Sequence, residues 1–172
     1  METTLARPLA QTLLPELAHE VSLTRRMLER VPETRFGWQP HAKSMPLGLL
    51  AAHTADLIGG IAHTMQSTEI DLAAGNSLRP TAPESTAELL RRLEANGEAA
   101  ADALARAEAE DFAQTWTLRA GEQVFMRQTR AEVVRHLISH TVHHRAQLAV
   151  YLRLLDVPVP SIYGPSADEA AH

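Results

Sequence analysis

The sequence predicts an all-α protein of four helices, with one short β-hairpin between the third helix and the fourth. Four long stretches carry apolar residues at helical spacing. Between the last two, short runs of strand-favouring residues flank Gly121. A chain of 172 residues without cysteine is long enough to bury a core without disulfides. We therefore expect one domain over residues 1–165 and a frayed tail over residues 166–172.

The first helix is expected between Pro8 and Val31. Pro15 fits best in a first turn, which favours a start near Thr12, and Pro32 ends the pattern. The apolar residues that share one face are Leu14, Leu17, Val21 and Leu28.

The second helix is expected to begin with Ser44 as its N-cap and Pro46 in its first turn, and to run to about Gln66. His53 lies in the middle of its apolar stripe, and Gly60 on the same side favours close approach of another helix. The apolar members of the stripe are Leu49, Leu50, Leu57 and Ile61.

Residues 67–83 are interpreted as a connection with at most one short helical turn, because glycine and proline interrupt any longer pattern. Ser85 and Glu88 form a capping-box pattern at the start of a third helix over residues 84–107. The hairpin that follows pairs residues 115–118 with residues 124–126 around Gly121. A lone hairpin is marginal in water, so it must pack against the helices.

The last helix, over residues 129–155, opens with a second capping-box pattern, Thr129 and Glu132. His140 and His144 lie four residues apart and project from one face of it. At about 100° per residue, His144 falls about +40° from His140, inside an apolar stripe that spans about +20° to +80°. That stripe holds Val133, Leu137, Leu148, Tyr151 and Leu155. A histidine buried there needs a partner for its ring nitrogens.

Other polar residues border this stripe. His136 and His143 fall at about −40° and −60° from His140, at its polar edge, and are less suited as ligands. Together with Gln147, and with Tyr163 from the C-terminal segment, they are left open as neighbours of a site. A second apolar face at about +120° to +160° packs either on another helix of the chain or on a second subunit. Its residues are Val134, Ile138 and Leu152.

Three inward-facing histidines, His53, His140 and His144, resemble the ligand set of an open metal site. Imidazole suits zinc, nickel, copper and iron, so the ligand type does not choose the ion. A metal-bound water can become a hydroxide near neutral pH. Because the chain has no cysteine, a thiol ligand would have to arrive with a substrate. The alternative is that all three are hydrogen-bonded core residues that hold no metal.

Two stretches of the chain resemble the DinB/YfiT-like family, which is described as a family of metalloenzymes. The later stretch carries the histidine-rich motif of that family, and the earlier one resembles a second motif. The matching segments are His136–Gln147, Tyr151–Arg153, Pro160–Gly164, Trp38–Pro40 and Leu47–His53. Ala146 departs from the family pattern, which commonly has glycine after the arginine.

The resemblance implies an up-down-down-up four-helix bundle, often paired into a homodimer. It also implies that His53, His140 and His144 bind a divalent ion: zinc or nickel, with iron or manganese as alternatives. Family members with assigned activities include transferases and isomerases that use low-molecular-weight thiols. The expected function is thus a metal-dependent enzyme acting on a small molecule in bacterial stress or detoxification, such as a thiol-dependent transferase or a related hydrolase or isomerase. No general base is evident in the sequence.

The rival hypothesis is a non-catalytic dimeric helical protein with a structural metal. A role on nucleic acid is disfavoured by the formal charge of −5 and the absence of a basic run. No apolar stretch approaches the ~20 residues that span a bilayer. The N-terminal residues lack a signal-peptide pattern, so a cytoplasmic location is expected.

Overall fold

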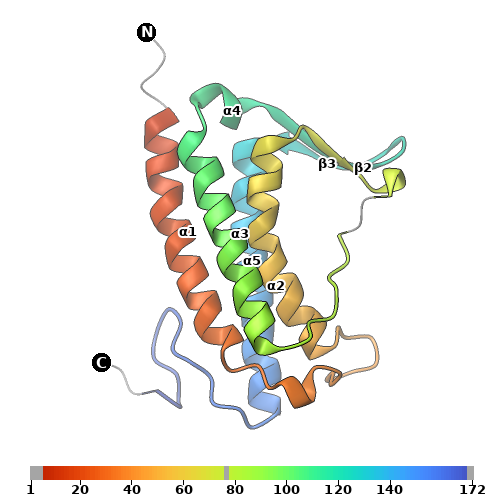
Figure 1. Ribbon diagram of the computed structural model, residues 1–172, viewed down its shortest axis with the longest axis vertical. Coiled ribbons are helices and arrows are strands. Elements are labelled where there is room, and N and C mark those ends of the chain that lie inside the picture. Colours follow the sequence, from red (N-terminus) through yellow and green to blue (C-terminus); the bar gives the residue numbers. More distant parts are fainter. Residues whose placement is uncertain (1–5, 76–77, 170–172) are drawn as a thin grey trace.

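The computed structural model describes residues 6–75 and 78–169. Four long helices lie side by side (Figure 1): α1 (Ala6–Leu28), α2 (Leu47–Gln66), α3 (Thr86–Arg106) and α5 (Arg130–Leu154). In that view α1 and α5 descend, whereas α2 and α3 ascend. A fifth, short helix, α4 (Ala109–Ala113), follows α3, and 3₁₀ turns occupy Glu33–Arg35 and Leu72–Ala74. The chain is thus mostly helical, as predicted, with five helices in its described part rather than four.

The helix ends show which capping predictions hold. Thr129 and Glu132 form the predicted capping box, with the Thr129 Oγ1 accepting from the Glu132 amide and the Glu132 carboxylate accepting from the Thr129 amide. Ser85 accepts from the Glu88 amide at the start of α3. The prediction of Ser44 as a cap is wrong, because α2 begins only at Leu47.

Helix α1 differs from its prediction in both start and orientation. It begins at Ala6, so Pro15 lies in its interior rather than in its first turn. Its buried face includes Glu20 and Thr24, while the predicted Leu14 and Val21 are only half-buried. The apolar pattern was misleading here because two polar residues, satisfied by partners within the protein, occupy the inner face.

The predicted hairpin belongs to a larger sheet of three strands in the order β1-β2-β3. Strands β2 (Thr115–Ala120) and β3 (Gln123–Thr129) pair antiparallel around Gly121, which adopts a φ of 59°. Strand β1 (Glu69–Asp71) pairs parallel to β2, so the interpretation of residues 67–83 as a strand-free connection is wrong. Arg119 on β2 holds this short strand through ion pairs to Glu69 and Asp71.

Helix α2 is the centre of the core, with several side chains fully removed from solvent. Gly60 allows α5 to approach, since a Cβ there would lie 3.3 Å from Leu137. The second apolar face of α5 is buried within the chain, so it packs on the protein's own helices and offers no surface to a second subunit. Its three residues, Val134, Ile138 and Leu152, are 0%, 2% and 0% exposed.

The C-terminal segment returns to the helices. Asp168 binds Arg153 of α5, and Glu169 binds Arg26 of α1 and Arg30 just after that helix. The tail that the sequence predicted to be frayed begins at residue 166; within it Asp168 and Glu169 make these ion pairs, and residues 170–172 lie outside the described part. Within residues 6–75 and 78–169, no helix has the length and apolar character needed to cross a bilayer.

Candidate metal centre

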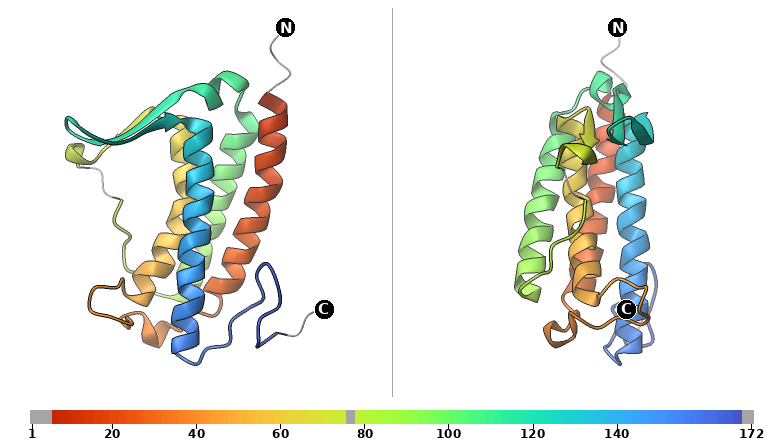
Figure 2. Two further views of the ribbon diagram at one scale, coloured as in Figure 1. Left: turned by 180° about the vertical axis from the view of Figure 1, so that it is seen from behind. Right: turned by 90° about the vertical axis from the view of Figure 1, so that its right-hand side faces the viewer.

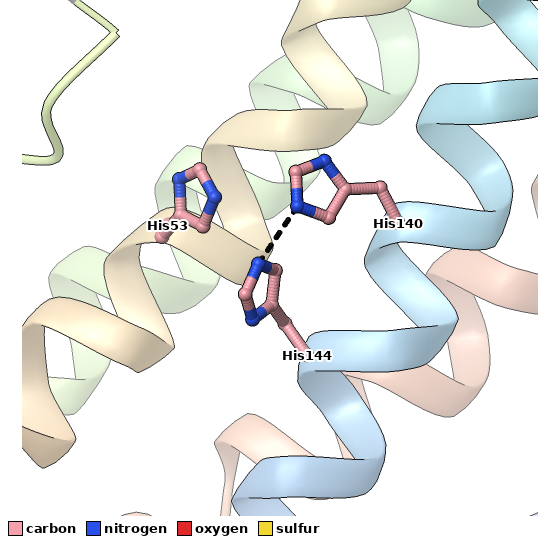
Figure 3. Close-up of side chains that lie close together, drawn as sticks. All are labelled: His53, His140 and His144. Carbon is pink, nitrogen blue, oxygen red and sulfur yellow. Dashed lines mark hydrogen bonds between the residues drawn. The ribbon is translucent and has the colours of Figure 1, made fainter. Parts of the chain in front are cut away.

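The contact between α2 and α5 brings together the three histidines singled out by helical periodicity. His53 projects from α2, and His140 and His144 project from successive turns of α5, with their rings turned toward one another (Figure 3). Each ring offers one nitrogen, and these three nitrogens lie within 4.8 Å of one another. The ring centroid of His53 lies 5.4 Å from that of His140 and 4.7 Å from that of His144.

Gln147 fixes the tautomer of His144. Its side-chain carbonyl oxygen lies 2.7 Å from Nδ1 of His144, so that ring nitrogen carries the proton and donates it. The lone pair of His144 is then on Nε2, which lies 2.9 Å from Nε2 of His140. The amide group of Gln147 lies 3.1 Å from Nε2 of His143. A chain of hydrogen bonds thus aims the lone pair of His144 at the other two rings.

The surroundings keep the three rings neutral. Burial, followed by the charges that His144, His53 and outer histidines would carry, lowers the pKa of His140 to about 4. Burial also lowers the pKa of His53, and the nearby His144 lowers it further. The pKa of His144 is lowered by burial against the opposing effect of its hydrogen bond to Gln147. Neutral imidazole is the form that binds metals.

The other histidines in the described part of the chain lie outside this group. His136 and His143 are exposed, with ring centroids 5.5 Å from His140 and 5.0 Å from His144 respectively. They border the site, as their helical angles predicted. His19, His41 and His63 are exposed as well.

The donor set fits a divalent transition metal. Zinc binds imidazole nitrogen at about 2.0–2.1 Å, which in tetrahedral geometry puts two such nitrogens about 3.3 Å apart. The Nε2 atoms of His140 and His144 lie 2.9 Å apart, and the three candidate nitrogens lie within 4.8 Å of one another, which is close to the spacing that one ion requires. Small rotations of the three side chains would bring their ring nitrogens to bonding distance of one ion. No fourth histidine or carboxylate among the described residues joins the group, which leaves a coordination position for another ligand.

A cavity of about 580 Å³ adjoins the site, and His53 and His140 form part of its wall. Cavities of this size typically bind small molecules. Much of the remaining wall is apolar and comes from α2, α5 and the sheet. The larger apolar side chains are Leu57, Ile70, Leu78, Trp116, Leu118, Met126 and Leu137.

A family model described as the DinB family matches residues 1–171. The chain belongs to the DinB family. The fold is also that of solved DinB-like structures. A DinB-like protein from Bacillus subtilis superimposes with a TM-score of 0.69 at 14% identity, covering 90% of this chain and 99% of that one. One from Bacillus cereus gives a TM-score of 0.67 at 20% identity, covering 95% and 100%. No curated protein is a significant match.

One buried polar cluster in this DinB-family chain was missed by the sequence analysis. Arg145, only 2% exposed, pairs with Glu20 of α1 at 2.7 Å and also donates to the Glu20 carbonyl and the Thr24 hydroxyl. The Tyr163 hydroxyl lies 2.6 Å from Arg145 and 2.8 Å from the Glu20 carboxylate. Tyr163 therefore joins this cluster rather than the rim of the histidine site. Tyr163 as a whole is 63% exposed, but desolvation of its hydroxyl, and then the hydrogen bond to Glu20, raise its pKa.

The cluster fixes α5 against α1 at the residue next to His144. No local spacing connects residue 20 to residue 145, so periodicity could not reveal the pair. The only sequence signal was a carboxylate and an arginine on helices that were each expected to face the core.

Proposed function

We propose that this chain is a metal-dependent enzyme of the DinB family, in which His53, His140 and His144 hold a divalent ion beside a substrate cavity. The observation that carries the proposal is the convergence of three neutral imidazoles from two helices on one point in the wall of a 580 Å³ cavity. Zinc or nickel suits this nitrogen donor set best, with iron or manganese as alternatives.

The reaction class we favour is transfer to or from a low-molecular-weight thiol, with hydrolysis or isomerisation of a small molecule as related chemistry. A bound divalent ion would act as a Lewis acid and lower the pKa of a thiol or water at its open position. The protein has no cysteine, so the thiol would come with the substrate. Such chemistry suits a role in stress response or detoxification.

The protein's own residues would prepare the site in three ways. Gln147 orients the His144 ring and directs its lone pair inward. The partly buried surroundings keep all three rings unprotonated, so that protons do not compete with the ion at neutral pH. The apolar cavity wall removes water from the substrate and strengthens electrostatic interactions there.

The proposal includes the up-down-down-up four-helix bundle and the homodimer implied by the family resemblance. The opposite directions of α1 and α5 relative to α2 and α3 support the bundle topology (Figure 1). Sedimentation velocity of the metal-loaded protein tests the dimer: we expect a single species of twice the 18.9 kDa chain mass.

An activity assay tests the function. Zinc- or nickel-loaded protein is incubated with glutathione or cysteine and 1-chloro-2,4-dinitrobenzene, and the thioether is measured by its absorbance. We expect a rate above the metal-free background that is lost in His140→Ala. The same loss should not occur in His41→Ala, which changes an exposed loop residue.

Thermal unfolding separates this function from a structural metal. If the site is catalytic, His53→Ala should keep the helical circular dichroism and a melting temperature near that of the metal-free parent protein. If the metal is structural, the parent protein should lose stability steeply when the metal is removed, and stability should follow metal occupancy.

A further inference from the structure

The cavity beside the histidines is long, with the candidate metal centre at one end and the sheet at the other. On α2 it is lined from His53 to Thr64, and on α5 from Val133 to His140. At a rise of about 1.5 Å per residue, these stretches extend about 16 Å and about 10 Å along the helices. The sheet lies where α2 ends and α5 begins (Figure 2).

The sheet closes this end with a row of apolar side chains. Ile70 on β1 is in register with Leu118 on β2, and Leu118 with Met126 on β3, and all three line the cavity. Side chains alternate between the faces of a strand, so Phe125 beside Met126 points outward, where it is 53% exposed. The small sheet therefore has an inner face that belongs to the cavity.

Trp116 completes the inner face. It lies two residues from Leu118 on the same strand, is 5% exposed, and lines the cavity. Its indole nitrogen donates to the Ser67 hydroxyl at 3.1 Å, which satisfies its polar atom and fixes the ring. The ring is thus held as a rigid apolar wall.

The polar side chains of the cavity come from the helices and from the segment before α3, and none of them comes from the inner face of the sheet. They are His53, Asp56, His63, Thr64, Arg79, Asn96, His136 and His140. The Thr64 hydroxyl, near the sheet, already donates to the Gly60 carbonyl, and His63, Arg79 and His136 are exposed. A sugar or a phosphate pressed against the inner face of the sheet would lose its hydration there without gaining hydrogen-bond partners from the side chains of that face. An alkyl chain or an aromatic ring would gain free energy from the same contact.

We propose that the cavity binds a small molecule with an apolar alkyl or aromatic body, and that the inner face of the sheet selects that body. The head group of the ligand reaches His53 and His140, and its body extends toward Ile70, Leu118 and Met126. The placement of the head group rests on the proposed function, whereas the apolar chamber rests on the cavity lining alone.

Straight-chain hydroxamic acids test both ends at once, because the hydroxamate head chelates metal ions and the alkyl tail varies. Isothermal titration calorimetry of the zinc-loaded protein compares acetohydroxamic acid with its homologues up to octanohydroxamic acid. We expect the Kd to fall about fourfold per added methylene, the fold-change that corresponds to ~0.8 kcal/mol for each buried CH₂. A Kd that is independent of chain length overturns the proposal.

Two substitutions at adjacent residues test whether the sheet causes this dependence of the Kd on chain length. Met126→Trp narrows the chamber and should weaken octanohydroxamic acid at least tenfold while leaving acetohydroxamic acid unchanged. Phe125→Trp adds the same side chain on the outward face and should change neither Kd. Met126→Phe is the substitute if circular dichroism shows that Met126→Trp does not fold. Equal effects at the two residues also contradict the proposal.

A metal-free arm separates this proposal from the proposed function. The zinc-free protein is titrated with 1-butanol, 1-hexanol and 1-octanol while tryptophan fluorescence is followed, with Trp116→Phe identifying the reporting ring. Tighter binding of the longer alcohols supports the chamber even if zinc does not bind. If zinc and acetohydroxamic acid bind but neither series gains affinity with length, the chamber is refuted and the metal site stands.

Discussion

The Nε2 atoms of His140 and His144 lie 2.9 Å apart, on successive turns of α5. Gln147 holds the proton of His144 on the opposite ring nitrogen, so the Nε2 atom of His144 presents a lone pair. Two lone pairs at this distance repel each other unless a proton or a cation lies between them. In the metal-free protein the neutral tautomer of His140 that carries its proton on Nε2 meets this condition by donating to Nε2 of His144, and a metal ion between the two nitrogens would replace that proton.

The metal-free protein should lose stability in mild acid. The pKa of His140 is lowered from its ordinary value of 6.5 to about 4 in the folded protein. At a pH between these two values, the unfolded chain therefore binds a proton at His140 that the folded chain does not bind. The contribution of neutral His140 to the free energy of unfolding is fully present above pH 6.5 and is lost as the pH falls toward 4. Urea unfolding at pH 7, 6, 5 and 4 measures it.

His140→Asn should flatten that pH dependence, whereas His41→Asn, in an exposed loop, should leave it unchanged. A parent protein whose free energy of unfolding is the same at pH 7 and pH 5 would contradict the account of His140.

Gln147→Leu should weaken zinc binding about 10- to 100-fold, which is the usual cost of removing a group that orients a metal-binding histidine. Leucine has a side chain of similar volume but cannot accept the hydrogen bond from Nδ1 of His144. Gln147→Glu keeps an acceptor and should retain the affinity. Competition with a chromophoric chelator measures the Kd, and equal affinities in the leucine and glutamate variants would remove Gln147 from the site.

Breaking the Glu20–Arg145 pair should destabilise the fold strongly. Arg145→Met leaves the carboxylate of Glu20 buried without its cation, and removing one partner of such a pair costs about 3–5 kcal/mol. Tyr163→Phe removes only the shared hydroxyl and should cost about 1 kcal/mol. Urea unfolding measures both changes.

A matched control comes from the exposed pair of Arg153 and Asp168, where Arg153→Met should cost less than about 1 kcal/mol. If the two arginine variants lose the same stability, the buried cluster has no special role in fixing α5.

Two helical glycines should respond to alanine in opposite directions. A Cβ at Gly59 would lie 2.6 Å from the Asn96 side chain, which donates to the Ala55 carbonyl, so Gly59→Ala should destabilise the protein. A Cβ at Gly97 would meet Val21 at an ordinary 3.4 Å. Gly97→Ala should therefore gain up to about 1 kcal/mol from helix propensity. Thermal unfolding of the two variants tests how closely α3 packs against α2 at Gly59 and against α1 at Gly97.

Local periodicity was enough to select the candidate site. His53, His140 and His144 each lie on an apolar stripe of a helix, and the rule that stripes face one core implied that their rings meet. The capping box at Thr129 likewise depends on residues three apart and was predictable for the same reason.

Features that depend on distant partners were not predictable in this way. Strand β1 has only three residues and exists because it pairs with β2 far along the chain. Glu20 lies on the buried face of α1 because Arg145 neutralises it. A hydrophobic pattern identifies a buried face only by its apolar residues. It therefore could not predict that the face of α1 that carries Glu20 is the one turned toward the core.

The central claim is that one ion binds three imidazoles from α2 and α5. X-ray absorption spectroscopy of the zinc-loaded protein tests it most directly, with His53→Ala as the comparison. The account predicts three imidazole nitrogens at about 2.0–2.1 Å in the parent protein and two in the variant. A zinc spectrum that does not change when His53 is replaced would contradict it.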